Sequence, residues 1–150
     1  ATRREPGPPP APGGDRWTPG ALAGEYRLVR RLGAGGMGTV YEAEHLPTGA
    51  RRALKALPAA AEPELLLRFQ REAELLARVD GHPNVVRIHA AFQALGAQVL
   101  AMDLLPGGDL MARLARGPLA PAEAVELGVA LARGLEHLHR HGVLHRDLKP

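Results

Sequence analysis

Apolar and polar residues alternate from residue 25 to residue 57, in runs separated by turn-forming segments. In the first run Tyr26, Leu28 and Leu32 alternate with arginines, as in a strand with one buried face. A glycine-rich turn follows this run, and the segment LPTG separates two further runs of the same kind. The pattern predicts three antiparallel strands over residues 25–57.

The period becomes helical over residues 62–79, where apolar residues recur at spacings of three and four: Leu65, Phe69, Ala73 and Leu76. Two more strands are predicted at residues 85–92 and 98–104, then a short helix near residues 109–115. A long helix is predicted from Pro121 to about His141, since proline suits the first helical turn. We expect one apolar face to hold Ala124, Val125, Gly128, Leu131, Ala132 and Leu135, and to be partly uncovered at Val125, Leu131 and Leu135 in residues 1–150. Five strands with one inserted helix, followed by helices, predict an α+β fold.

Residues 1–24 have a different composition, rich in proline and glycine. Proline removes backbone donors and glycine loosens the chain. We expect a disordered tail or linker there.

Composition excludes several classes of function. The formal net charge is +3, but the arginines are scattered and aromatic residues make up only 3%, which disfavours a nucleic-acid partner. No apolar run approaches the length of a membrane helix. The sequence has no cysteine, which fits a reducing compartment. We therefore expect a cytoplasmic chain with no membrane span in these residues.

The glycine-rich turn is the first candidate for chemistry. Glycines let backbone N–H groups approach a phosphate closely. The same spacing occurs in dinucleotide-binding folds, but there the glycines open a helix. Here the chain continues as a strand, so the glycines cap a hairpin, either over phosphates or as an ordinary flexible turn. The segment is Gly33, Ala34, Gly35, Gly36, Met37, Gly38, Thr39 and Val40.

Lys55 and Glu72 form the second candidate. Alternation puts Ala53 and Lys55 on one face of their strand, where a flexible point charge can hold phosphate oxygens. Glu72 lies on the apolar arc of its helix, and an inward carboxylate is costly unless it is paired. We expect an ion pair between the two, against the simpler reading of two solvated surface charges.

The segment after the long helix is the most specific signal. It reads His145-Arg146-Asp147-Leu148-Lys149-Pro150 and resembles the catalytic loop of serine/threonine protein kinases. With the glycine hairpin, Lys55 and Glu72 in order before it, the resemblance covers residues 26–150. The wording of the glycine segment and of His82-Pro83-Asn84 is most similar to the bacterial kinases.

The resemblance implies roles for individual residues. Val40 and Ala53 would enclose adenine, Leu32 and the glycine segment would cover the phosphates, and Met102 would be the gatekeeper before a hinge of Asp103, Leu104 and Leu105. Asp147 would accept the proton of the substrate hydroxyl, and Lys149 would steady the transferring phosphate. Asp103 departs from the family, which often has Glu there.

The resemblance also implies a two-lobe kinase fold, with residues 25–105 as the small lobe and residues 106–150 as the start of the large lobe. The expected function is transfer of the γ-phosphate of ATP to Ser or Thr of protein substrates, with Mg²⁺, in bacterial signalling. The metal-binding Asn and Asp-Phe-Gly would lie beyond residue 150, so we expect residues 1–150 alone to be inactive. A pseudokinase-like nucleotide-binding or docking module is the alternative, and a Rossmann dehydrogenase is a distant third.

Four histidines near the end of the chain, His137, His139, His141 and His145, raise the question of a metal site. On the expected helix only His139 lies with the apolar face, and His145 belongs to the loop motif. We expect no metal site among them.

Overall fold

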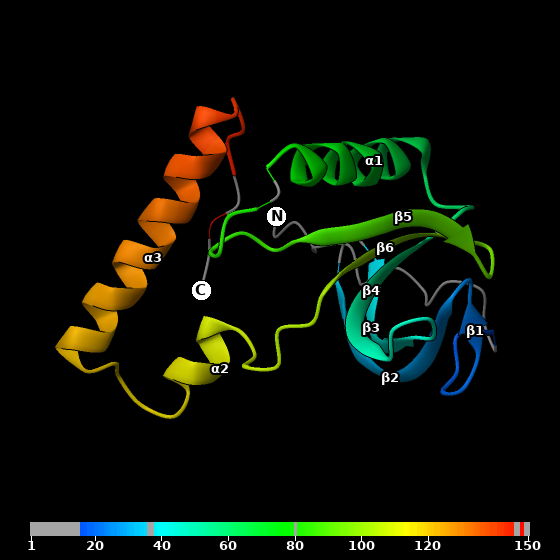
Figure 1. Ribbon diagram of the computed structural model, residues 1–150, viewed down its shortest axis with the longest axis horizontal. Coiled ribbons are helices and arrows are strands. Elements are labelled where there is room, and N and C mark those ends of the chain that lie inside the picture. Colours follow the sequence, from blue (N-terminus) through cyan, green and yellow to red (C-terminus); the bar gives the residue numbers. More distant parts are fainter. Residues whose placement is uncertain (1–15, 36–37, 80, 146–147, 149–150) are drawn as a thin grey trace, which may run out of the picture. The chain divides into compact units, whose positions relative to one another are not determined.

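The computed structural model describes residues 16–35, 38–79, 81–145 and 148, apart from the side chains of Glu72 and Leu76. In these residues it has six strands and three helices (Figure 1). Every predicted strand and helix is present, with ends shifted by a few residues. The elements are β1 (Leu22–Ala23), β2 (Tyr26–Gly35), β3 (Gly38–His45), β4 (Ala50–Pro58), α1 (Pro63–Arg78), β5 (Ile88–Ala94), β6 (Ala97–Asp103), α2 (Leu110–Leu114) and α3 (Pro121–Arg140).

The chain forms two compact units. The first contains the described residues up to Glu74 together with Ile88–Leu104, and the second contains Leu75–Arg87 and the described residues from Leu105 onward. Residues 75–87, which the sequence analysis assigned to the small lobe, cluster with the second unit. The reason is that Val79 and Val85 lie in one apolar cluster with residues of α3 and the segment after it.

The first unit is built on one curled antiparallel sheet in the order β1-β2-β3-β4-β6-β5 (Figure 1). The prediction of an antiparallel sheet with an inserted helix is confirmed. The sheet has one strand more than predicted, because the two residues of β1 pair with the start of β2.

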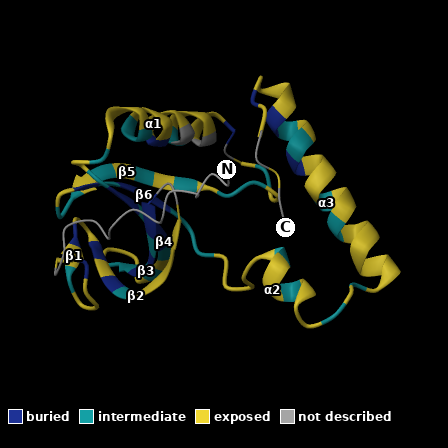
Figure 2. Cartoon of the chain, turned by 180° about the vertical axis from the view of Figure 1, so that it is seen from behind, coloured by how far each residue is buried: buried dark blue, intermediate teal, exposed yellow. Residues whose placement is uncertain are grey.

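The strand β4 has apolar contacts on both faces of the sheet. On one face Leu54 and Ala56 belong to a cluster with Tyr41 and Val99. On the other face Leu57 packs with residues of α1 and β6. Side chains on both faces of β4 are buried, and part of the strand is dark blue in Figure 2. The sheet is therefore held from two sides.

Residues 16–24 are part of this folded unit, which corrects their assignment to the tail; residues 1–15 lie outside the described residues. Trp17 is only 6% exposed, and its ring centroid lies 4.9 Å from that of Tyr41. The backbone of Gly20 and Ala21 is hydrogen-bonded to Leu28. One large aromatic residue thus anchors a segment whose proline and glycine content resembles that of a linker.

The second unit is centred on α3, whose buried residues lie toward the end of the helix. They are Gly134 and Leu138, with Leu135 of the predicted apolar face packed beside them, whereas Val125 is 66% and Leu131 is 42% exposed. Most of α3 is accordingly coloured as exposed in Figure 2. The contact is set by Asn84, whose Nδ2 donates to the Ala130 carbonyl at 2.8 Å.

Gly134 makes one contact of α3 that the sequence pattern did not predict. A Cβ at Gly134 would lie 2.9 Å from the Asn84 carbonyl oxygen, so glycine here permits a close backbone approach. A pattern of large apolar residues cannot reveal such a contact. Among the described residues, no helix has the combination of length and hydropathy that crossing a membrane requires.

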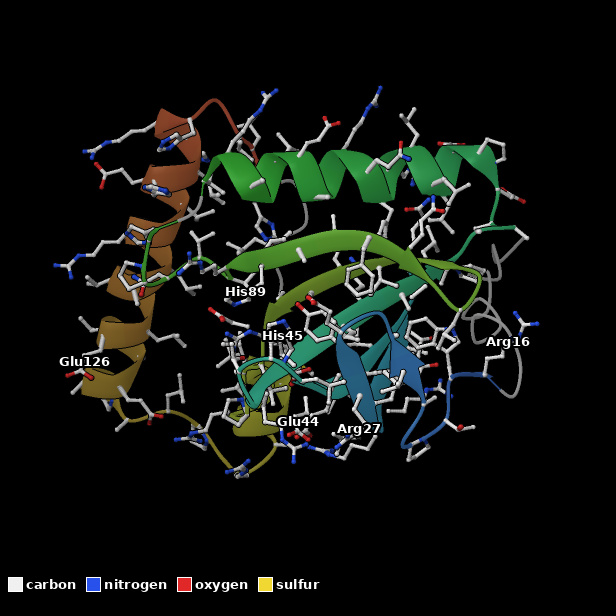
Figure 3. The ribbon with its side chains drawn as sticks, turned by 45° about the vertical axis from the view of Figure 1, so that its right-hand side comes forward. Arg16, Arg27, Glu44, His45, His89 and Glu126 are labelled. Atoms are coloured by element: carbon white, nitrogen blue, oxygen red, sulfur yellow. The ribbon has the colours of Figure 1, made fainter. Side chains whose placement is uncertain are left out.

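We predict that Trp17→Ala destabilises the first unit by roughly 3–5 kcal/mol, the usual cost of deleting a buried aromatic side chain. The measurement is thermal unfolding of the full-length protein, followed at the transition of this domain. Arg16→Ala is the matched control, since Arg16 is exposed and extends outward beside the buried tryptophan (Figure 3). Equal melting temperatures for Trp17→Ala and the wild type would contradict the assignment of residues 16–24 to the core.

Candidate active site

One face of the sheet gathers four of the predicted site residues. Val40 on β3 is paired with Lys55 on β4, and Ala53 is paired with Met102 on β6. Paired residues of antiparallel strands share a face, and alternation along β4 puts Ala53 and Lys55 together. The register therefore places Val40, Ala53, Lys55 and Met102 side by side.

This face is also the one that α1 covers. Phe69 of α1 is 3% exposed and packs with Leu57 and Leu100, and the Nζ atom of Lys55 lies 5.8 Å from the Phe69 ring centroid. Lys55 is thus a half-buried residue whose ammonium group lies near an aromatic ring, a contact that favours a cation.

Glu72 follows Phe69 on α1 by about one helical turn. Its side chain lies outside the described residues, so the ion pair with Lys55 stays a prediction.

The glycine segment forms a hairpin. Gly35 ends β2, Gly38 begins β3, and the two residues are paired. Gly36 and Met37, at the tip, lie outside the described residues. Because the chain leaves the glycines as a strand, this segment does not open a helix as a dinucleotide-binding fold requires.

The described glycines of the hairpin occur for different reasons. Gly38 has φ of 116°, and a Cβ there would lie 2.4 Å from the Ala56 carbonyl oxygen. At Gly33 and Gly35 an added Cβ would meet nothing within 4 Å. The fold requires glycine at position 38, but nothing within the described chain requires it at positions 33 and 35.

Leu32 and Ala34 complete the predicted phosphate-covering segment. Both are exposed, Leu32 to 39%. Leu32 is the extra residue of a β-bulge, since Arg31 pairs with Tyr41 and Gly33 with Val40. An exposed leucine at this position leaves apolar surface available next to the hairpin.

The predicted hinge begins at the end of β6. Met102 packs against the cluster on the α1 side of the sheet. Asp103 comes next and therefore points to the opposite face. Its Oδ1 accepts a hydrogen bond of 2.7 Å from Nε2 of His89 on β5. Sequence analysis missed His89, because β5 showed no recognisable motif at that position.

The remaining site residues belong to the second unit. Leu105 is 68% exposed. Asp147 and Lys149, with the predicted catalytic roles, lie outside the described residues, and His145 beside them is exposed.

The histidines of α3 form ring contacts and hydrogen bonds. His137 lies with its ring centroid 4.8 Å from that of His82 and 4.5 Å from that of His141, and its Nε2 donates to the Val79 carbonyl. His137 therefore packs against other described residues, whereas His139, which we expected on the apolar face, is exposed. In the part of the chain that the structure describes, no three His, Asp or Glu side chains are arranged to hold a metal ion.

Comparison with known proteins gives a consistent result. The family model described as protein kinase domain matches residues 26–150. The serine/threonine-protein kinase PknJ of Mycobacterium tuberculosis is 40% identical over 133 residues, covering 87% of this chain and 22% of PknJ. Serine/threonine-protein kinase pkn2 of Myxococcus xanthus is 41% identical over 131 residues, covering 86% of this chain and 16% of that protein.

Solved structures agree on the fold. The crystal structure of the Mycobacterium tuberculosis PknI kinase domain superposes with a TM-score of 0.73 at 36% identity, and the match covers 89% of this chain and 55% of that one. The chain thus spans about a fifth of the curated relatives and about half of that kinase domain. The matched family model, the fold and the register of the site lead to one conclusion: this chain belongs to the protein kinase domain family.

Proposed function

We propose that the protein carrying this chain transfers the γ-phosphate of ATP to Ser or Thr hydroxyls of other proteins. The observation that carries the proposal is the shared face of Val40, Ala53, Lys55 and Met102 beside the glycine hairpin. Serine/threonine-protein kinases among the relatives support the choice of substrate class.

In this proposal the nucleotide lies against the α1 side of the sheet. Val40 and Ala53 are the apolar surfaces for adenine, with Met102 at the back of the pocket. The hinge of Asp103, Leu104 and Leu105 offers main-chain N–H and C=O groups to the base. Lys55 holds α- and β-phosphate oxygens as a compact charge.

The chemical step needs little covalent participation from the protein. The substrate hydroxyl oxygen forms a bond to the γ-phosphorus, and the bond from that phosphorus to the β–γ bridging oxygen breaks, which releases ADP. Asp147 accepts the hydroxyl proton. Lys149 and Lys55 stabilise negative charge on the phosphate oxygens, with Glu72 holding Lys55 in place.

ATP-dependent phosphoryl transfer uses a divalent metal, which we propose to be Mg²⁺. The metal neutralises charge on the β- and γ-phosphates. The described residues offer no assembled set of ligands for it. By family resemblance its ligands are an Asn and the Asp of Asp-Phe-Gly, both following Asp147 in sequence.

A second candidate is a nucleotide-binding or docking module without catalysis. It would keep the apolar face and the hairpin but would not need a base at Asp147. The presence of Lys55, Glu72 and Asp147 in the sequence favours the active enzyme. Since ATP is the donor, we propose a cytoplasmic site of action, with proteins and not nucleic acids as partners.

We predict that Lys55→Met and Asp147→Asn in the full-length protein each reduce phosphoryl transfer by about 10²-fold or more. Lys55→Arg is also poor, because a planar guanidinium does not replace a point charge. Transfer of radiolabelled phosphate from ATP to a generic basic protein measures the effect.

Nucleotide binding separates the two candidate functions. If the wild type binds ATP but transfers no phosphate under any metal condition, the docking module is correct. If Asp147→Asn keeps near-normal activity, Asp147 is not the base. Arg51→Met, which removes an exposed β4 cation on the same face of the strand, is the control for loss of charge.

We predict that alanine substitutions at two glycines of the hairpin affect different properties, one the stability and the other the KM for ATP. Gly38→Ala lowers the free energy of unfolding by about 2 kcal/mol or more, because of its positive φ and its contact with Ala56. Gly35→Ala leaves the melting temperature nearly unchanged but raises the KM for ATP several-fold, since the added methyl group occupies space that phosphates approach. Thermal melts and ATP titrations of both variants check this, and an unchanged KM in a folded Gly35→Ala protein would contradict the role of the hairpin.

A further inference from the structure

His89 occupies an irregular position in the sheet. On β5, Ile88 pairs with Met102 and Ala90 pairs with Ala101, so His89 is an extra residue with no partner position on β6. It is thus the added residue of a β-bulge opposite the predicted gatekeeper. Figure 3 shows His89 at the start of β5. Bulges are common next to active sites, where they change the direction of a side chain, so the contact that His89 makes is of functional interest.

The bulge changes which face each residue of β5 presents. Ile88 packs with the cluster on the α1 side, whereas Ala90 and Phe92 pack with the cluster on the opposite side. In a regular strand Ile88 and Ala90 would share a face. The extra residue therefore allows Ile88 and Ala90 to pack on opposite faces of the sheet. The side chain of His89 is left to contact Asp103.

The contact that His89 makes is short and specific. Its Nε2–H donates to Oδ1 of Asp103 at 2.7 Å, and the two side chains are 22% and 43% exposed. On β4 the residue opposite Asp103 is Arg52, whose guanidinium donates to the Arg51 carbonyl oxygen. The Asp103 carboxylate thus accepts a hydrogen bond from His89 across the end of the sheet.

Asp103 is the last residue of β6 and the first residue of the predicted hinge. Its side chain points away from the face of Lys55 and Met102, so it cannot meet a nucleotide bound there. What Asp103 can present to the base is its main chain. A hydrogen bond from His89 to the Asp103 side chain, on the opposite face of the sheet, therefore restricts the orientation of the Asp103 main-chain N–H and C=O groups.

We propose that His89 is a positioning residue, which holds the start of the hinge in its nucleotide-binding orientation through Asp103. The inference rests on the proposed function and extends it to a residue outside the nucleotide site. A simpler role, a partly exposed ion pair that only adds stability, would contribute about 1 kcal/mol or less and leave nucleotide affinity unchanged. Loss of His89 would thus change the affinity for ATP in the positioning role, but only the stability of the fold in the simpler role.

The experiment compares His89→Leu and His89→Gln in the full-length protein, with steady-state phosphoryl transfer measured at varied ATP concentration. Leucine fills similar volume without a donor, whereas the glutamine amide can still donate to the carboxylate. We expect His89→Leu to raise the KM for ATP about 5–10-fold with kcat within about 2-fold, a change of about 1–1.4 kcal/mol in binding. His89→Gln restores most of the affinity.

Arg140→Leu is the control, because it breaks another short, partly exposed ion pair, Arg140 to Glu136 at 2.6 Å, which joins two residues of α3 and none of the sheet. It should leave KM unchanged. The double variant His89→Leu/Asp103→Ala should have the same KM as Asp103→Ala alone, since the proposed effect passes through Asp103.

The outcomes separate the inference from the proposed function. An unchanged KM in His89→Leu, or an equal loss in His89→Leu and His89→Gln, overturns the positioning role. A wild type that binds ATP without transferring phosphate overturns the proposed function only. The role of His89 is then decided by the dissociation constant for ATP in the same variants. A wild type that binds no ATP overturns both.

Discussion

The register of β4 between β3 and β6 is the constraint on which the candidate site depends. Leu54 and Ala56 are fully buried in the cluster that contains Tyr41 and Val99, and this contact fixes which residues point to each face. A slip by one residue would turn Lys55 into that cluster, and a buried unpaired ammonium is very costly. The apolar contacts that stabilise the sheet therefore also place Lys55 beside Phe69, Val40 and Met102. The same strand register is therefore required for the stability of the sheet and for the position of Lys55.

Three register shifts interrupt the described strands, and two of them lie next to candidate site residues. Leu32 is an extra residue just before the glycine hairpin, and His89 is an extra residue opposite Met102. Each bulge lets an apolar strand keep its core contacts while one side chain is released from the pattern. A regular strand could not place Ile88 and Phe92 on opposite faces. The bulge at His89 is thus required by packing on both faces of the sheet. His89 itself is not needed for that packing, and its side chain contacts Asp103.

Most of the fold could be predicted because its signals are local. The strands from Tyr26 to Pro58 alternate clearly, and Asp109 caps α2 through its side chain, as expected at a helix start. The misses arise from contacts between residues distant in sequence. Trp17 lies among prolines and glycines, yet it packs on Tyr41. The apolar face of α3 was predicted from its side chains, but its contact with Asn84 depends on the absence of a side chain at Gly134. His89 gives no signal without the register of β5 against β6. The motif residues could be recognised because each motif is a short local segment that resembles the kinase pattern in residue type and spacing.

The choice of lysine rather than arginine at position 55 bears on the proposed function. The chain has 19 basic residues, and only Lys55 and Lys149 are lysines. The contact with Phe69 does not explain the choice, because arginine makes cation–π contacts at least as well. A half-buried position on a strand does not explain it either, since arginine buries its stem in the same way. What lysine supplies and arginine does not is a compact charge that can approach phosphate oxygens from one side. In a chain whose basic residues are arginines apart from Lys55 and Lys149, the lysine at position 55 therefore favours the proposed role of holding phosphate oxygens.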